Sequence, residues 1–329
     1  MRWYLITCTA LVVVACVVSV AVGARPISLT VLWHYWSDPT LVSSTDLAII
    51  HARFARTLTG LLVGIALAVS GSTMQGMTRN PLADPGLLGL NAGAASAVVL
   101  GIYTFGIGSV LGYASFAFIG AACATVTVYA IASYGKTGAT PVRLALAGAA
   151  LSAGLSSITS AILLIDQQTV NQFRMWQMGI LGARGTGEIL IIAPFIVVGA
   201  FVMLIFGSRL LNILALGDAT ATSLGIRPNR ARMCLALITV LLAGSATALA
   251  GPIGFLGLIV PHAARLLVGG DYKHILALSL LLGPLALLTA DVVGRVIMSP
   301  AEIQAGVMTA LLGAPVFIAL VRTRKQVQL

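Results

Sequence analysis

Charged residues are scarce in this sequence, and their scarcity excludes most soluble folds. Only 9% of the 329 residues are charged, and nine are acidic, whereas a soluble domain usually has about 25% charged residues. The longest stretches without an apolar run, near residues 24–46 and 166–187, are too short to fold alone. With 59% hydrophobic residues and a mean hydropathy of +1.03, the composition predicts one membrane domain covering residues 1–329.

Cysteine is also sparse, with four residues that all lie within apolar runs. The spacing of Cys8, Cys16, Cys123 and Cys234 fits neither a zinc site nor a disulfide framework, so we interpret them as small apolar residues. Residues 13–16 resemble a lipoprotein cleavage box. The apolar run continues through Val22, however, which favours a retained spanning helix.

Motifs for catalysis and for nucleic-acid binding are missing. The net charge of +10 comes from basic residues at segment ends, with no basic stripe or aromatic platform. Residues 130–137 end like a P-loop, but they begin with alanine and follow a hydrophobic helix, which favours a basic helix end. The four histidines lie far apart, and no His-Glu zinc motif occurs. We therefore expect no enzyme, no metal site and no cofactor in this chain.

Apolar runs long enough to cross a membrane, which takes about 20 residues, recur along the chain. The region 233–268 is divided in two because Gly251-Pro252 and Gly254 interrupt it, and Pro with Gly breaks a helix. The sequence thus predicts an all-α integral membrane protein with ten spans, at residues 4–23, 57–77, 87–105, 108–133, 144–165, 188–207, 233–251, 253–268, 274–297 and 304–321.

The distribution of basic residues predicts the orientation. With both termini in the cytoplasm, 13 of the 19 Lys and Arg residues fall in cytoplasmic segments. The 13 are Arg2, Arg79, Lys136, Arg143, Arg209, Arg227, Arg230, Arg232, Arg265, Lys273, Arg322, Arg324 and Lys325. The other six are Arg25, Arg53, Arg56, Arg174, Arg184 and Arg295. An even number of spans fits this division.

Two pairs of ionisable residues stand near the outer ends of spans. Asp291 and Arg295 are four residues apart and share a helix face, which indicates either an ion pair at a helix end or a functional site within the membrane. Arg53 and Arg56 also share a face. They fit either interfacial snorkelling or a cationic patch for an acidic partner.

Two polar segments interrupt the apolar pattern on the cytoplasmic side. Residues 79–93 contain Asn80, Asp84 and two prolines directly before a Gly-rich helix, which suggests a transport gate; residues 79–85 are expected at the cytoplasmic mouth. The loop 208–230 is predicted to form two short helices broken at Gly217, with Asp218 as a possible cap of the second. It fits an amphipathic surface helix or a docking element for a cytoplasmic partner.

Six blocks in order resemble the FecCD-type permeases of bacterial ABC importers, which take up ferric siderophores, haem or cobalamin. They cover residues 53–57, 71–75, 79–89, 216–225, 251–262 and 302–315, including Asn-Pro-Leu-Ala-Asp-Pro at 80–85 and Gly-Pro-Ile-Gly-Phe-Leu-Gly at 251–257. The resemblance extends over almost the whole chain. It implies the type II permease fold of ABC importers in the bacterial cytoplasmic membrane.

The resemblance also implies partners. A second permease subunit, identical or closely homologous, would enclose the path. Two cytoplasmic ATPase subunits would bind ATP and Mg, and a binding protein would dock outside.

It further assigns roles to residues. ATPase coupling falls on Leu216, Gly217, Asp218, Ala221, Leu224 and Gly225. Binding-protein docking falls on Arg53, Arg56 and Arg295. The cytoplasmic gate falls on Asn80, Pro81 and Leu82, with Pro141 and Ala145 opposite.

The substrate is less closely specified. Residues 172–179 resemble a Phe-Arg-Phe-Trp pattern of siderophore members, with methionine replacing the second aromatic residue. Arg174, Trp176 and Gln75 are candidates for the substrate path. A ferric siderophore is favoured, while Arg174 would also suit a haem propionate, and cobalamin comes third. Two other classes stay open: an ion-coupled secondary transporter using Asp291, and a membrane scaffold.

Overall fold

Helix α3, which spans Ser44–Thr78, is the axis of the fold, and most of its residues from Ala55 onward are buried. The structure is a computed structural model that describes residues 1–329 except 24, 135–139, 184 and 324–329, and the described residues form helices and turns without strands. At 1.5 Å per residue, α3 extends about 50 Å, compared with a hydrocarbon core of about 30 Å. Helix α3 is therefore longer than one crossing requires.

Each of the ten predicted spans corresponds to a helix or a continuous helical run. They are α1 (Arg2–Ala21), α3, α4 (Leu90–Phe105), α5 (Val110–Ser133), α6 (Pro141–Ile165), the run of α8 (Thr186–Val202), η4 (Met203–Gly207) and α9 (Ser208–Ala215), then α11 (Pro228–Ala250), α12 (Leu256–Val268), α13 (Tyr272–Ile297) and α14 (Ala305–Thr323). By length and composition, seven helices in the described ranges could cross a membrane, and α4, α12 and α14 are shorter apolar helices. The prediction of about ten spans is confirmed.

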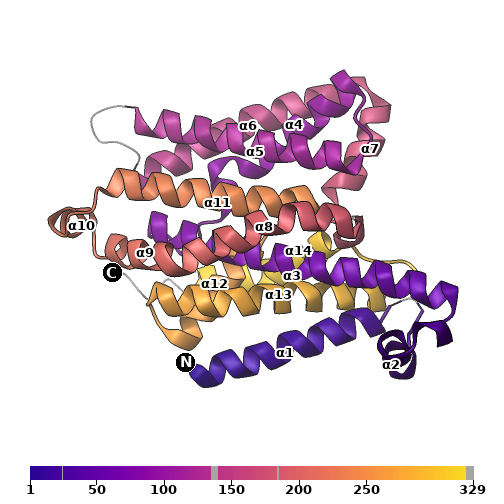
Figure 1. Ribbon diagram of the computed structural model, residues 1–329. Helices are drawn as coiled ribbons and strands as arrows, with labels where there is room; N and C mark the ends of the chain where they lie inside the picture. The colour runs from indigo at the N-terminus through magenta and orange to yellow at the C-terminus, as the bar shows by residue number, and fades with distance from the viewer. Residues whose placement is uncertain (24, 135–139, 184, 324–329) are drawn as a thin grey trace.

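The spans form groups around α3. Helices α13, α11 and α12 pack directly on it, and α1 lies along α13 (Figure 1). Helices α4, α5 and α6 pack on one another, and α11 joins them to α3 through its contacts with α5. Shorter elements connect these spans: α2 (Leu29–Ser37), η1 (Pro39–Leu41), η2 (Pro85–Leu88), α7 (Gln167–Gln177), η3 (Leu181–Ala183) and α10 (Asp218–Ser223).

Glycines such as Gly64 and Gly93 allow the central helices to approach one another closely. A Cβ added to Gly64 would lie 2.5 Å from the backbone nitrogen of Pro284, and one added to Gly93 would lie 2.4 Å from the carbonyl oxygen of Gly120. Small residues at such crossings compensate for the lack of a hydrophobic driving force between helices in lipid. Gly89 differs, since its φ of +73° makes it a turn residue before α4.

The predicted division between α11 and α12 is confirmed. Gly251 has φ +76°, and Phe255 adopts the left-handed region with φ +66°. Residues 251–255 therefore leave the helical path before α12 begins at Leu256. Some predictions fall outside the described residues: part of the P-loop-like segment, residues 135–137, and the basic residues Lys136, Arg184, Arg324 and Lys325.

Candidate functional site

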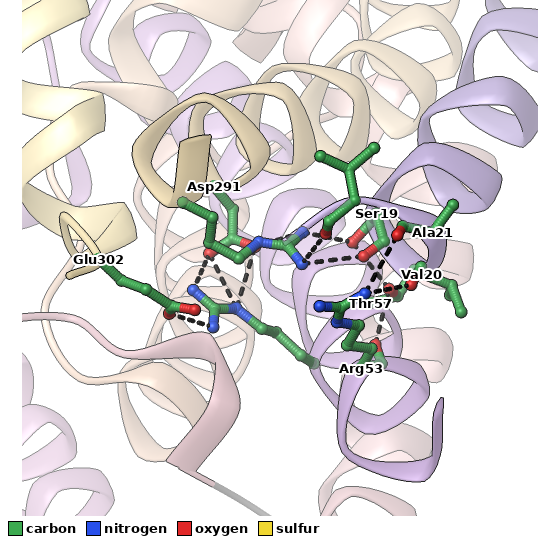
Figure 2. A network of polar contacts seen from close by, with 10 residues as sticks. Ser19, Val20, Ala21, Arg53, Thr57, Asp291 and Glu302 are labelled. Atoms are coloured by element: carbon green, nitrogen blue, oxygen red, sulfur yellow. Dashed lines mark hydrogen bonds and ion pairs between the residues drawn. The ribbon is translucent and has the colours of Figure 1, made fainter. Parts of the chain in front are cut away.

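Two polar networks lie at opposite ends of the bundle, and the one at the end predicted to face outward, called the outer network here, centres on Asp291. Asp291 and Arg295 of α13 form the predicted i, i+4 pair, with 3.1 Å between Asp291 Oδ2 and Arg295 Nη2. Arg56 of α3 donates from Nε and Nη2 to the same carboxylate at 2.8–3.1 Å. Figure 2 shows Asp291 within this network of polar contacts, and its side chain is fully buried.

The network also fixes the end of α1. Arg295 donates to the carbonyl oxygens of Ser19 and Val22 and to Ser19 Oγ at 2.9–3.0 Å. Arg53 donates to the carbonyl oxygens of Val20 and Ala21 at 3.1 Å (Figure 2). The last carbonyls of a helix have no partner within the helix, and a nearby cation stabilises them. The two arginines thus satisfy the C-terminal turn of α1.

This geometry corrects the expectation of three arginines displayed at the outer rim. The Arg295 side chain is only 1% exposed and that of Arg56 13% exposed. Burial of both charges is tolerable because Asp291 and the α1 carbonyls surround them. Arg56 reaches the surface through its ion pair with Glu302, 2.6 Å long, and the Glu302 side chain is 34% exposed. Whether Arg53, Arg56 or Arg295 engages a partner stays a prediction.

The same contacts bear on the secondary-transporter alternative. Both carboxylate oxygens of Asp291 accept hydrogen bonds from guanidinium groups. A transported cation would have to displace two fixed positive charges in a medium that screens them poorly. Asp291 therefore fits a structural ion pair better than a cation site.

The inner network is built around the short helix α10. Gly217, with φ +107°, precedes α10, and Gly225, with φ +78°, follows it, as the predicted breaks required. Ala221 is the fully buried residue of α10, while Leu216 and Leu224, which flank the helix, are 64% and 57% exposed. An apolar pair facing water beside a buried alanine fits a contact surface for a partner.

Two details of the predicted loop are wrong. Residues 208–215 are not a separate short helix, because α9 continues α8 through a π-helical turn at Met203–Gly207. Asp218 is not the N-cap of α10; Gly217 holds that position and Asp218 is the first helical residue. Its carboxylate instead accepts hydrogen bonds from two arginines.

Those two arginines come from different spans. Arg232 of α11, which is 2% exposed, donates to both Asp218 oxygens at 2.7–2.9 Å. Arg79, the residue after α3, donates from Nη2 to Asp218 and from Nε to the carbonyl oxygen of Leu214 at 2.8 Å. The hydrogen bonds from Arg232, together with the attraction of Arg79, hold the pKa of Asp218 below its usual range. Asp218 is therefore ionised at neutral pH.

The loop after Arg79 differs from the expectation in its depth. Asn80 Oδ1 accepts from the Leu82 backbone N–H at 3.0 Å and so fixes the turn. Asp84 then lies against Gly257 of α12, because a Cβ there would stand 3.3 Å both from Asp84 Oδ2 and from Gly71 Cα. Gly71 precedes Arg79 by about two helical turns. The loop thus turns back along the bundle, so Asp84 does not lie at the end where the sequence predicted residues 79–85, and η2 and the 16-residue α4 follow it.

The predicted gate residues differ in exposure and lie on two segments of the chain. Asn80 is exposed, Pro81 and Leu82 are partly buried, and Pro141 begins α6 with Ala145 partly buried one turn later. Their assignment to a gate stays a prediction.

The three path candidates do not come together. Gln75 is 1% exposed and donates to the Leu258 carbonyl oxygen at 3.3 Å. Trp176 is 7% exposed and stacks on Phe173 with 5.7 Å between ring centroids. Only Arg174 is exposed. The side chains of Gln75 and Trp176 pack inside the subunit, and the assignment of the three residues to a substrate path stays a prediction.

Sequence reasoning missed the exposed face of α6. Two adjacent helical rows on this face carry small residues, Ala149, Ala153, Ser156 and Ser160 in one and Ala150, Gly154, Ser157 and Ala161 in the other, although Leu146, Ile158 and Leu164 are exposed next to them. The exposed face of α8, in contrast, consists of Leu190, Ile191, Phe195, Val197, Val198 and Phe201. The sequence signal for this face was the recurrence of serine residues at helical spacing in the span 144–165.

Comparison with known proteins places the whole chain. The family model for the FecCD transport family matches residues 11–323. The ferric enterobactin transport system permease protein of Escherichia coli (strain K12) is 44% identical over 95% of this chain and 93% of its own length. The hemin transport system permease protein of Yersinia pestis is 37% identical over 96% and 94%.

A solved structure agrees with this placement. It is an inward-facing conformation assigned to a metal-chelate type ABC transporter, and it superposes with a TM-score of 0.84 at 29% identity, covering 98% of this chain and 99% of its own.

Proposed function

Because this chain belongs to the FecCD transport family and is a multi-pass permease subunit of an ABC importer, we propose that two such subunits enclose a path for a ferric siderophore between them. The observation that supports a path is the small, hydroxyl-bearing face of α6. Exposed serines gain nothing from lipid tails, and small residues permit a second subunit or a bulky solute to approach. An identical second subunit is the simplest partner; a close homologue is the alternative.

The substrate proposal rests on relatives. The permease from E. coli serves ferric enterobactin by its name, whereas that from Y. pestis serves hemin. The first shares more residues with this chain, so a ferric siderophore comes first, haem second and cobalamin third. The path itself needs no tight site, because the cargo must leave it.

Energy for transport would come from two ATPase subunits that bind ATP and Mg and dock on α10. Support comes from the exposed Leu216 and Leu224 beside the buried Ala221. Basic residues are exposed at the same end of the bundle, namely Arg209, Arg227, Arg230 and Lys273. Their presence supports the proposal that this end faces the cytoplasm at the bacterial inner membrane, with the start of α1 on the same side.

Coexpression with the ATPase and binding protein of the same transport system tests this function. We expect the Leu216→Asp/Leu224→Asp variant to lose copurification of the ATPase, because two charges replace an exposed apolar contact. Reconstituted vesicles should take up radiolabelled ferric siderophore only with ATP, and excess haem or cobalamin should not compete.

The control for this experiment is Lys273→Gln, an exposed change on the same side outside α10. It should leave both copurification and uptake unchanged. Retention of the ATPase by the double aspartate variant, or uptake that an ionophore abolishes while ATP depletion does not, would contradict the proposal.

The binding protein would dock at the opposite end, next to Arg53, Arg56 and Glu302. In this structure Glu302 occupies the Nη1 edge of Arg56, where a partner carboxylate would otherwise bind. We expect Glu302→Gln to strengthen docking by about two- to fivefold at low salt, because it removes one competing charge from the rim.

Docking affinity can be measured by titrating the binding protein onto the permease complex in nanodiscs. The gain should shrink at high ionic strength, because exposed charges are screened beyond about 10 Å. Equal affinities for Glu302→Gln and the unmodified protein at low salt would remove Arg56 from the docking surface.

A further inference from the structure

One carboxylate connects three elements at the inner end of the bundle. Asp218, the first residue of α10, accepts hydrogen bonds from Arg232 of α11 and from Arg79 at the end of α3. Arg232 is almost fully buried, so it holds Asp218 from the protein side. Arg79 is 38% exposed and holds it from the side of the loop that leads to α4.

The backbone conformation of Arg79 is one that arginine rarely adopts. It is one of two described non-glycine residues with positive φ, at φ +51° and ψ +31°, and it ends α3. Asparagine or glycine would adopt this conformation with less strain. The arginine side chain uses its position to reach across two elements, with Nε on the Leu214 carbonyl oxygen at the end of α9 and Nη2 on Asp218.

The loop that follows Arg79 is held by successive hydrogen bonds. The Asn80 backbone N–H donates to the Gln75 carbonyl at 3.2 Å, and those of Leu82 and Ala83 donate to the side-chain and backbone oxygens of Asn80 at 3.0 Å. The Gly86 N–H then donates to Asp84 Oδ1 at 2.8 Å. These successive hydrogen bonds restrict the backbone between Arg79 and η2, so a shift of Arg79 would move the turn that follows it.

We infer that Arg79 is a positioning residue that transmits movement of α10 to the Asn80–Leu82 turn, with Asp218 as the joint and Arg232 as its anchor. The inference rests on the proposed docking of an ATPase on α10. A displacement of α10 moves Asp218, which either draws Arg79 and the turn with it or breaks the pair and releases them. Both outcomes couple the partner's state to the start of α4, and such bistable contacts are the usual way small shifts are amplified.

Arginine is suited to this role and lysine is not equivalent. The planar guanidinium bonds Leu214 and Asp218 simultaneously in a fixed geometry, whereas a single ammonium on a flexible stem positions neither. Lysine therefore retains the charge and loses the two-element connection, which separates electrostatics from positioning.

The experiment uses the full permease with its ATPase and binding protein in nanodiscs or vesicles and compares Arg79→Gln, Arg79→Lys and Asp218→Asn. We expect each variant to copurify with the ATPase, while uptake per ATP hydrolysed falls by about three- to thirtyfold, the range of residues that modulate coupling from outside the binding sites. Arg79→Lys should fall nearly as far as Arg79→Gln. The double variant Arg79→Gln/Asp218→Asn should be no worse than the poorer single variant, because both act through one pair.

The matched control is Arg230→Gln, an exposed arginine of α11 whose loss changes the net charge equally. It should leave uptake per ATP unchanged. The double variant Arg230→Gln/Asp218→Asn should therefore show the same uptake per ATP as Asp218→Asn alone. A purely structural role of Arg79 would lower yield and thermal stability but leave uptake per ATP of the assembled complex intact, and that result overturns the inference. Loss of ATPase binding in Arg79→Gln alone also overturns it, whereas failure of the unmodified permease to bind the ATPase refutes the proposed function instead.

Discussion

Replacing Asp291 with asparagine should lower the free energy of unfolding by about 3–5 kcal/mol, because it leaves the buried Arg295 without a counter-charge and leaves Arg56 with Glu302 alone. The Asp291 side chain is completely buried and those of Arg56 and Arg295 nearly so, so water cannot take over the lost interaction. The end of α1 should loosen as well, since Arg295 holds its last carbonyl groups. Denaturant titration in mixed micelles measures the loss.

The control for this prediction is Asp46→Asn, at an ion pair on the same side of the protein. Asp46 pairs with Arg25 at 3.1 Å, but the Arg25 side chain is 59% exposed. An exposed pair contributes at most about 1 kcal/mol, so this variant should unfold close to the unmodified protein. Equal small losses for both variants would show that the Asp291 cluster contributes no more than a surface pair.

Adding one methyl group at Gly71 should have an effect of similar size. The Cβ of alanine would lie 1.9 Å from the carbonyl oxygen of Gly257 and 2.4 Å from its Cα, so α3 and α12 would have to separate. Backbone atoms cannot rotate away as a side chain can. We expect Gly71→Ala to cost about 3 kcal/mol, the upper end of overpacking effects. Asp84 also lies on Gly257, so uptake should fall too.

The same substitution at Gly154 should change the free energy of unfolding in the opposite direction. A Cβ at Gly154 on α6 meets nothing within 4 Å, and Gly154 is helical. In the isolated subunit, Gly154→Ala should raise stability by about 0.5–1 kcal/mol, because alanine loses less backbone entropy in a helix. Thermal unfolding of both variants in one detergent gives the comparison. A stabilised Gly71→Ala would show that α3 and α12 can move apart freely.

Contacts within a helix were predictable from the sequence, and contacts between helices were not. The Asp291–Arg295 pair followed from i, i+4 spacing, and Gly251-Pro252 marked the end of α11. Nothing in the spacing showed that Arg56 would bind Asp291 across 235 positions, or that Arg79 would reach Asp218 across 139. The candidate site was therefore predicted as separate residues, and the sequence did not show that three of them, Gln75, Trp176 and Arg295, have buried side chains.

The sequence by itself determined the approximate number and positions of the spans, because lipid offers no hydrogen-bond partners and a crossing must be built from apolar helix. It also determined the family, because ordered motifs persist along the whole chain. The tertiary structure alone decided which charges are buried, which face of α6 is open and how deep the loop after Arg79 returns. Those outcomes depend on which helices meet, and hydropathy is nearly equal on every face of a membrane helix.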